Sequence, residues 1–222
     1  MTERKVKQFE LLIFDWDGTL ADSTRAIVDA VYYACDMTGI ERPSEQAACD
    51  IIGLELRAAL KALFATVDDD TLATLVKHYQ QHFTAIQNDI VLFDGVQAAL
   101  KTLSDRGFML TVASGKGRNG LQHAIERSGL GELILAKRSA DDCFSKPHPQ
   151  MLHELMDELG VDKSRSVMIG DTTFDMQMAQ NAGVASLAVS YGAQVAEKLY
   201  PYAPLACFDS FAKLYTWLST NA

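Results

Sequence analysis

The chain of 222 residues is long enough to bury a substantial hydrophobic core, and it fits one domain with a large insertion or two modest domains. Its net charge of -9, from 29 acidic and 20 basic side chains, gives no positive field that would attract DNA or RNA, so we expect no nucleic-acid partner. The four cysteines form no CxxC pair, and no apolar run reaches the roughly 20 residues of a membrane helix, so we expect a cytoplasmic protein with no membrane partner.

Short apolar runs of strand length alternate along the chain with segments of helical periodicity. VQAALKTLSDRG (96–107) and PQMLHELMDELG (149–160) repeat apolar residues at helical spacing. Alternation of strands and helices is typical of a parallel sheet covered by helices on both faces, which is an α/β fold. The expected strands are 9–14, 108–114, 133–136, 166–169 and 185–189.

The segment between the first two strands lacks a convincing strand and contains several helical stretches, from STRAIVDAVYYACDMTG to DDDTLATLVKHYQQHF. The sequence therefore predicts a core domain formed by residues 1–20 and 93–222 and an inserted helical domain formed by residues 21–92. No low-complexity or Pro-rich linker is present, so we expect two short hinges near residues 20 and 92.

The end of the first expected strand carries two acids, in the sequence Asp15-Trp16-Asp17-Gly18-Thr19. Residues i and i+2 of an extended segment point the same way, so the two carboxylates are expected close together. A cation or a shared proton would relieve their repulsion, and such a pair suits a nucleophile beside a general acid and base. The alternative is an Asx-type turn at the strand end, which accounts for Asp-Gly but not for both acids.

Two further strand ends carry groups that suit an anion. Ser114-Gly115-Lys116-Gly117 offers a hydroxyl, backbone N–H groups and the start of a helix. Lys146, held by the following Pro147, could balance carboxylates and a phosphoryl group, although a lone lysine is more often solvated.

The strand at 166–169 ends in GDTTFD, where Asp171 and Asp175 lie four positions apart. The alternative interpretation is that the two acids only stabilise the N-terminus of a helix. Parallel strands deliver their carboxyl ends to the same edge, so these groups are expected to meet. Carboxylate oxygens are the ligands that Mg²⁺ prefers, and the combination predicts a Mg²⁺-dependent phosphoryl-transfer site.

The ordered motifs resemble those of the haloacid dehalogenase superfamily, subfamily IA, and in particular phosphoglycolate phosphatases. DWDGTL is similar to the first motif of this family and GDTTFD to its fourth. The resemblance implies a Rossmann-like parallel sheet core (the HAD fold) with an inserted helical cap domain. It implies Asp15 as nucleophile forming an aspartyl-phosphate and Asp17 as general acid and base. It also implies a phosphate-binding set consisting of Thr19, Ser114, Gly115 and Lys146.

The resemblance further implies a Mg²⁺ cofactor. Its ligands would be Asp15, Asp171 and the backbone carbonyl of Asp17. Asp175 would act through a water molecule or by orienting Lys146, which would also neutralise charge during catalysis.

The expected activity is hydrolysis of a small phosphorylated metabolite, with phosphoglycolate as one candidate. A phosphomutase of the β-phosphoglucomutase type and a phospho-accepting signalling module are the alternatives. Arg57 and Lys61 are candidates for contacting a substrate carboxylate or second phosphate. The simpler interpretation is that both lie on a solvated face of a helix. A monomer or a homodimer would be compatible with this site.

Overall fold

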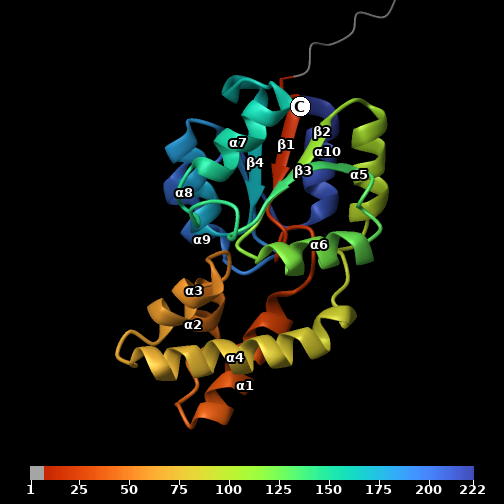
Figure 1. The fold of residues 1–222 in the computed structure, drawn as a ribbon. Coiled ribbons are helices and arrows are strands. Elements are labelled where there is room, and N and C mark those ends of the chain that lie inside the picture. Colours follow the sequence, from red (N-terminus) through yellow and green to blue (C-terminus); the bar gives the residue numbers. More distant parts are fainter. Residues whose placement is uncertain (1–7) are drawn as a thin grey trace, which may run out of the picture.

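The computed structural model describes residues 8–222, and its centre is a six-stranded sheet with the strand order β3-β2-β1-β4-β5-β6 (Figure 1). Every neighbouring pair of strands is parallel. The expected α/β fold with a parallel sheet is therefore confirmed. The strands are β1 (Leu11–Phe14), β2 (Met109–Ala113), β3 (Ile134–Arg138), β4 (Ser166–Gly170), β5 (Ala185–Val189) and β6 (Cys207–Phe208).

Strand β1 lies in the middle of the sheet and is buried on both faces. Leu12 and Phe14 point into one hydrophobic cluster, and Leu11 and Ile13 point into another, as the alternation of a strand requires. The first cluster is covered by α5 (Val96–Asp105), α6 (Arg118–Arg127) and α10 (Phe211–Asn221), and the second by α7 (Gln150–Leu159) and α8 (Thr173–Ala182). Burial on both faces explains why these strands read as continuous apolar runs.

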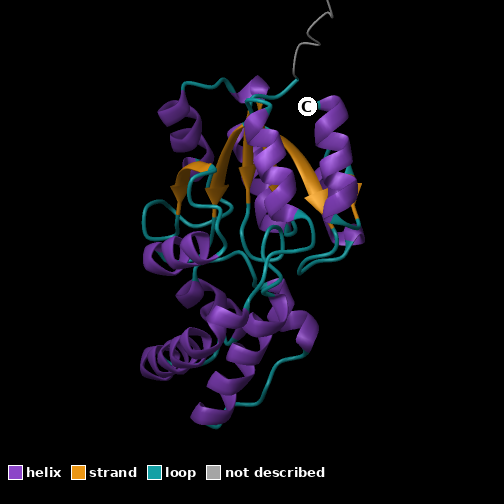
Figure 2. Ribbon diagram, turned by 90° about the vertical axis from the view of Figure 1, so that its right-hand side faces the viewer, coloured by secondary structure: helices purple, strands orange, loops and turns teal. Residues whose placement is uncertain are grey.

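Four helices lie together on one side of the molecule, beyond the ends of the strands, and we call them the cap helices (Figures 1 and 2). They share their own hydrophobic cluster, which includes Val31, Leu60 and Leu75. The strand arrowheads in Figure 2 point toward these helices, so the carboxyl ends of the strands face them. The cap helices are α1 (Thr24–Thr38), α2 (Glu45–Asp50), α3 (Leu56–Leu63) and α4 (Asp69–Ile86).

The two connections between the sheet and the cap helices run side by side. Ala21 and Leu92 form an antiparallel bridge, and the Phe93 amide donates to the Leu20 carbonyl over 3.0 Å. These contacts lie where the sequence predicts hinges, near residues 20 and 92. The division into two domains at these residues stays a prediction.

Short elements complete the described part of the chain: the 3-10 turns Gln87–Asp89, Lys163–Arg165 and Tyr200–Tyr202, and the helix α9 (Ala196–Leu199). Over residues 8–222, none of the helices combines the length and the apolar character that a membrane crossing requires.

Candidate active site

The loop after β1 places Asp15 and Asp17 at the carboxyl edge of the sheet. The Asp15 amide continues the sheet by donating to the Ile169 carbonyl over 2.8 Å. Gly18 then turns the chain with a φ of 79°, a conformation that glycine adopts without strain, and its amide donates to the Ala21 carbonyl over 2.9 Å. Asp15 and Asp17 are consequently only 1% and 7% exposed.

The ammonium group of Lys146 pairs with one acid of the first motif and one acid of the fourth motif. Its Nζ lies 2.7 Å from Asp15 Oδ1 and 2.6 Å from Asp175 Oδ1, and the whole residue is 2% exposed. Burial alone would lower the pKa of Lys146, but attraction to the two carboxylates holds this pKa above its usual value. Lys146 is therefore a fixed positive charge beside Asp15, not a solvated surface lysine.

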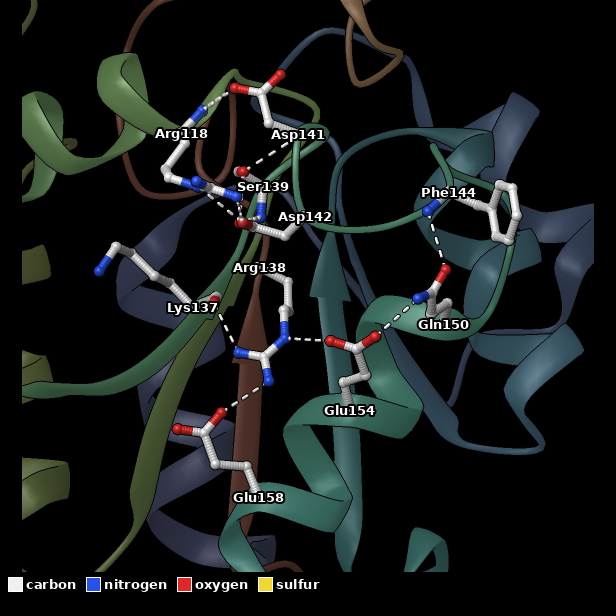
Figure 3. Close-up of polar contacts among 10 residues, drawn as sticks. All are labelled: Arg118, Lys137, Arg138, Ser139, Asp141, Asp142, Phe144, Gln150, Glu154 and Glu158. Carbon is white, nitrogen blue, oxygen red and sulfur yellow. Dashed lines mark hydrogen bonds and ion pairs between the residues drawn. The ribbon is translucent and has the colours of Figure 1, made fainter.

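The segment that carries Lys146 is fastened on both sides by polar contacts (Figure 3). The Phe144 amide donates to Gln150 Oε1 over 3.0 Å, and Gln150 Nε2 donates to Glu154 over 2.7 Å. Glu154 in turn accepts from Arg138 at the end of β3 over 2.6 Å. This chain of contacts fixes the backbone from which Lys146 reaches Asp15.

Asp171 follows β4 and is fully buried, with both carboxylate oxygens accepting hydrogen bonds. Thr19 Oγ1 donates to Oδ1 over 2.8 Å, and the Ala193 amide donates to Oδ2 over 2.7 Å. The Thr19 hydroxyl, expected to bind phosphate, thus positions Asp171 in this structure. Sequence reasoning missed Ala193, because a backbone amide in the loop after β5 leaves no side-chain signature.

Asp175 is oriented by the start of helix α8. Its Oδ2 accepts from the Thr172 amide over 3.1 Å and from the Thr172 hydroxyl over 2.7 Å. The Asp175 amide donates in return to Thr172 Oγ1 over 3.4 Å, which completes a capping box. Its Oδ1 is paired with Lys146. Both oxygens are therefore engaged, an arrangement consistent with the expectation that Asp175 orients Lys146.

The carboxylates of Asp15, Asp171 and Asp175 converge, with one oxygen of each within 4.8 Å of the others. Burial raises the pKa of Asp15 well above its usual range, and burial together with Asp175 raises the pKa of Asp171 to about 7. Asp15 Oδ2 is buried and has no hydrogen-bond partner. Three acids against the single ammonium of Lys146 favour a divalent cation, which would lower both pKa values.

Asp17 lies outside this convergent group and has separate partners. Ser23 Oγ donates to Asp17 Oδ1 over 2.6 Å, and Lys116 Nζ approaches the same oxygen at 3.0 Å. Sequence reasoning missed Ser23, although a serine directly before a helix was a signal for a polar contact. The carboxylate cluster consists of Asp15, Asp171 and Asp175 and does not include the Asp17 side chain. Metal binding by Asp17, expected through its backbone carbonyl, stays a prediction.

The turn after β2, which contains Ser114 and Gly115, brings the core into close contact with the cap helices. Ser114 is buried, and its Oγ accepts from the Lys116 amide over 3.2 Å. A Cβ on Gly115 would collide with the backbone carbonyl oxygen of Gly53 and lie 2.7 Å from that of Leu54. Glycine is therefore required at position 115 for this approach of the cap helices.

We expect Gly115→Ala to lower kcat/KM by roughly tenfold or more, because overpacking against backbone costs about 1–3 kcal/mol and opens the site. Steady-state kinetics with a phosphomonoester measure this effect. Gly131→Ala is the control, because a Cβ there meets nothing within 4 Å and Gly131 does not line the cavity described below. Equal kcat/KM for both variants would contradict the close approach.

A cavity of about 500 Å³ lies between these motifs and the cap helices. Asp15, Asp17 and Gly115 line its core side. Ile52, Tyr79 and Phe83 line its cap side together with other apolar and amide side chains. The size suits a small ligand whose reacting group lies at Asp15.

The site has acids at adjacent ends of parallel strands, a buried lysine between them and a cavity above. This combination is typical of a phosphoryl-transfer site. Residues 12–189 match the family model of haloacid dehalogenase-like hydrolases. The chain belongs to this family.

Known relatives agree with this assignment. The chain is 32% identical over 209 residues to "Probable phosphatase IndB" of Dickeya dadantii, covering 92% of this chain and 91% of the relative. It is 32% identical over 222 residues to "Phosphoglycolate phosphatase" of Colwellia psychrerythraea, covering 95% and 97%. It is 28% identical over 185 residues to "Pyrophosphatase PpaX" of Halalkalibacterium halodurans, covering 83% and 85%.

The fold is also similar to a crystal structure of a predicted phosphoglycolate phosphatase from Haemophilus somnus 129PT. The TM-score is 0.86 at 22% identity, over 96% of this chain and 99% of the other. Family membership and the names of the relatives confirm the expected enzyme class, a phosphatase of the haloacid dehalogenase type.

Proposed function

We propose that the protein is a Mg²⁺-dependent phosphatase that hydrolyses small phosphate monoesters through an aspartyl-phosphate on Asp15. The observation that carries the proposal is the environment of Asp15 at the base of the cavity. Lys146 binds one of its oxygens at 2.7 Å, and its other oxygen has no hydrogen-bond partner. A buried, oriented carboxylate with one free oxygen is suited to nucleophilic attack.

The residues present fit a divalent cation. Asp15 Oδ2 is an orphaned buried acceptor, and the convergent carboxylates are oxygen donors of the type that Mg²⁺ prefers. Asp15 and Asp171 would hold the ion together with the Asp17 backbone carbonyl, and Asp175 would support it through a water molecule or through Lys146. Bound Mg²⁺ would neutralise charge on the phosphoryl oxygens.

The first step is attack of an Asp15 oxygen on phosphorus, which breaks the bond from phosphorus to the ester oxygen. Asp17 gives its proton to the departing alkoxide. The Gly115 amide, the Ser114 hydroxyl and the Lys146 ammonium would stabilise the phosphoryl oxygens during transfer. The product of this step is an alcohol and a phosphorylated Asp15.

The second step is hydrolysis of the acyl phosphate. Asp17 takes a proton from water, the water oxygen attacks phosphorus, and the bond to the Asp15 oxygen breaks. Phosphate leaves and both acids return to their starting states. The Ser23 hydroxyl and the Lys116 ammonium hold Asp17 in place for both proton transfers.

We expect the metal-free protein to lose stability as the pH rises from about 4 to about 7. Asp171 has a folded-state pKa of about 7 against an unfolded value near 4, so its contribution is complete below the unfolded pKa and is lost as the pH rises through the folded pKa. Saturating Mg²⁺, at about 100 times its Kd, should restore roughly 2.7 kcal/mol at neutral pH.

Thermal melting in EDTA and in Mg²⁺, from about pH 5 to about pH 8, checks this expectation. Asp171→Asn should flatten the decline in EDTA and weaken the response to Mg²⁺. A melting temperature that is independent of both pH and Mg²⁺ would contradict the metal site.

The activity itself is tested by phosphate release from a panel of phosphomonoesters with Mg²⁺ and with EDTA. We expect Mg²⁺-dependent release of phosphate with repeated turnover. Transfer of the phosphoryl group to a second sugar hydroxyl without release would indicate a phosphomutase, and phosphorylation without turnover would indicate a signalling module. Each of these two results would overturn the proposed hydrolysis.

The proposed location is the cytoplasm, supported by the free thiol state of all four cysteines, each of which lies in the described part of the chain. The proposed partner is a small phosphorylated metabolite.

A further inference from the structure

The charges on the cavity wall indicate which substrates the site accepts. This inference rests on the proposed function. The phosphoryl group would lie at Asp15, so the leaving group would occupy the remainder of the cavity. Among the lining residues that the structure describes, Lys116 is the single basic side chain. Apart from the two reacting acids, the wall has two further carboxylates, Glu55 and Asp141.

The positive charge of Lys116 is already engaged. Its Nζ lies 3.0 Å from Asp17 Oδ1 and 4.5 Å from the centroid of the Phe83 ring. Its side chain is only 13% exposed, so it is held between the general acid and a cap helix. A substrate anion would have to compete with Asp17 for this cation.

Three further basic side chains, those of Arg57, Arg118 and Lys61, lie on segments next to the cavity, and each has a partner elsewhere. Arg57 pairs with Asp69 at 3.2 Å, within the cap helices. Arg118 begins α6, next to the turn at Gly115, but its guanidinium group pairs with Asp142 at 2.6 Å (Figure 3). Neither arginine lines the cavity.

Lys61 is likewise directed away from the cavity, because its Nζ donates to the Val67 carbonyl over 3.1 Å. Arg57 and Lys61 were the candidates for contacting a substrate carboxylate or second phosphate. Both have partners within the segment of the cap helices, which supports the interpretation that they belong to a solvated helix face.

Glu55 is fixed in position by the cap and the core together. Its carboxylate accepts from the Arg57 and Ala58 amides over 2.8 and 2.9 Å at the start of α3. Its own amide donates to Ser145 Oγ of the core over 3.1 Å. The carboxylate therefore stays on the cavity wall instead of swinging into solvent.

Asp141 is fixed in a similar way on the core side. Its Oδ2 accepts from the Arg118 amide over 2.7 Å at the start of α6 (Figure 3). Among the described lining residues there is no unpaired cation, so the two anchored carboxylates repel an anionic leaving group. The remaining polar side chains of the lining are neutral hydrogen-bonding groups, from Tyr79, Gln80, Thr84, Gln87 and Asn119.

We propose that this phosphatase selects phosphate monoesters whose leaving group is neutral or cationic, such as a hydroxyl-bearing or amine-bearing alcohol. It discriminates against leaving groups that carry a carboxylate or a second phosphate. Glu55 is a specificity-determining residue in this selection. Phosphoglycolate, the sequence-based candidate, and pyrophosphate are accordingly poor substrates of this chain.

The test compares kcat/KM at low ionic strength for 2-phosphoglycolate, glycerol 3-phosphate and phosphoethanolamine with Mg²⁺. Repulsion between like charges in a partly buried site predicts that 2-phosphoglycolate is at least about tenfold poorer than the other two compounds. A value for 2-phosphoglycolate that equals or exceeds the others would overturn the inference.

Two variants tie the discrimination to the Glu55 charge. Asparagine and aspartate both cap helices well, so Glu55→Asn removes the charge and Glu55→Asp keeps it at a shorter reach. We expect Glu55→Asn to narrow the ratio of kcat/KM between glycerol 3-phosphate and 2-phosphoglycolate by several-fold, and Glu55→Asp to preserve most of it. Equal ratios in the two variants would refute the role of Glu55.

A generic ester, p-nitrophenyl phosphate, separates this inference from the proposed function. If the protein hydrolyses neither this ester nor any compound of the panel, the proposed function fails. If it hydrolyses the ester through Asp15 but prefers 2-phosphoglycolate, only the inference about the leaving group fails.

Discussion

Replacing Asp15 by asparagine is expected to lower kcat by roughly 10⁴-fold or more with every phosphomonoester, because an amide is a poor nucleophile and the acyl phosphate no longer forms. Asparagine has nearly the size of aspartate, and it keeps an oxygen for the Lys146 ammonium at the position that accepts over 2.7 Å. Steady-state phosphate release in Mg²⁺ measures the effect.

The fold of this variant is expected to be intact. Burial raises the pKa of Asp15 well above its usual range, so the neutral amide removes a charge that is costly in the metal-free protein. Melting in EDTA should therefore show a temperature no lower than that of the wild type. Residual turnover above about one per cent in a folded Asp15→Asn variant would show that another group attacks phosphorus.

Replacing Lys146 by methionine should destabilise the protein by about 3–5 kcal/mol, because it leaves the buried carboxylates of Asp15 and Asp175 without their counter-charge. For a chain of this size the melting temperature should fall by roughly 10 °C. Activity should be lost as well, since the phosphoryl group and Asp15 lose their fixed cation. Calorimetry and phosphate release measure the two effects separately.

The matched control is Lys213→Met. Lys213 pairs with Asp209 at 2.7 Å, but both side chains are 65% exposed, and an exposed pair contributes at most about 1 kcal/mol. Asp175→Asn in the Lys146→Met background should recover part of the lost stability by removing one unpaired charge. Similar melting temperatures for the two methionine variants would contradict the buried role of Lys146.

The five strands expected from the sequence are present, because buried parallel strands leave continuous apolar runs. Their ends differ by up to two residues; for example, β1 begins at Leu11 instead of residue 9, and β3 continues to Arg138. The strand β6 was not predicted, since two residues are too short to form a pattern. The last helix, α10, was also missed, although Phe211, Leu214 and Leu218 are spaced to bury one face.

The candidate site was predictable wherever a charged side chain follows a strand, as with Asp15, Lys146, Asp171 and Asp175. These residues meet because parallel strands share one carboxyl edge. Contacts made by backbone groups or across the cap were not predictable. The Ala193 amide on Asp171 and the Lys116 ammonium on Asp17 depend on how separate loops pack, and sequence spacing does not encode such packing.

The charge of the cavity wall also required the structure. The sequence offers Arg57 and Lys61 on one amphipathic helix as partners for a substrate anion, but both are engaged within the cap helices. Glu55, on the same stretch, faces the cavity instead. The leaving-group preference therefore follows from the direction of individual side chains and not from the motifs.

Trapping the acyl phosphate tests the role of Asp15 as nucleophile most directly. The wild-type protein with Mg²⁺ and a turned-over phosphomonoester is quenched in acid, and borohydride is added to reduce any acyl phosphate to an alcohol. We expect tandem mass spectrometry to identify homoserine at position 15, and none after omission of substrate. Efficient turnover with an unmodified Asp15, or modification at another acid, would contradict Asp15 as the nucleophile.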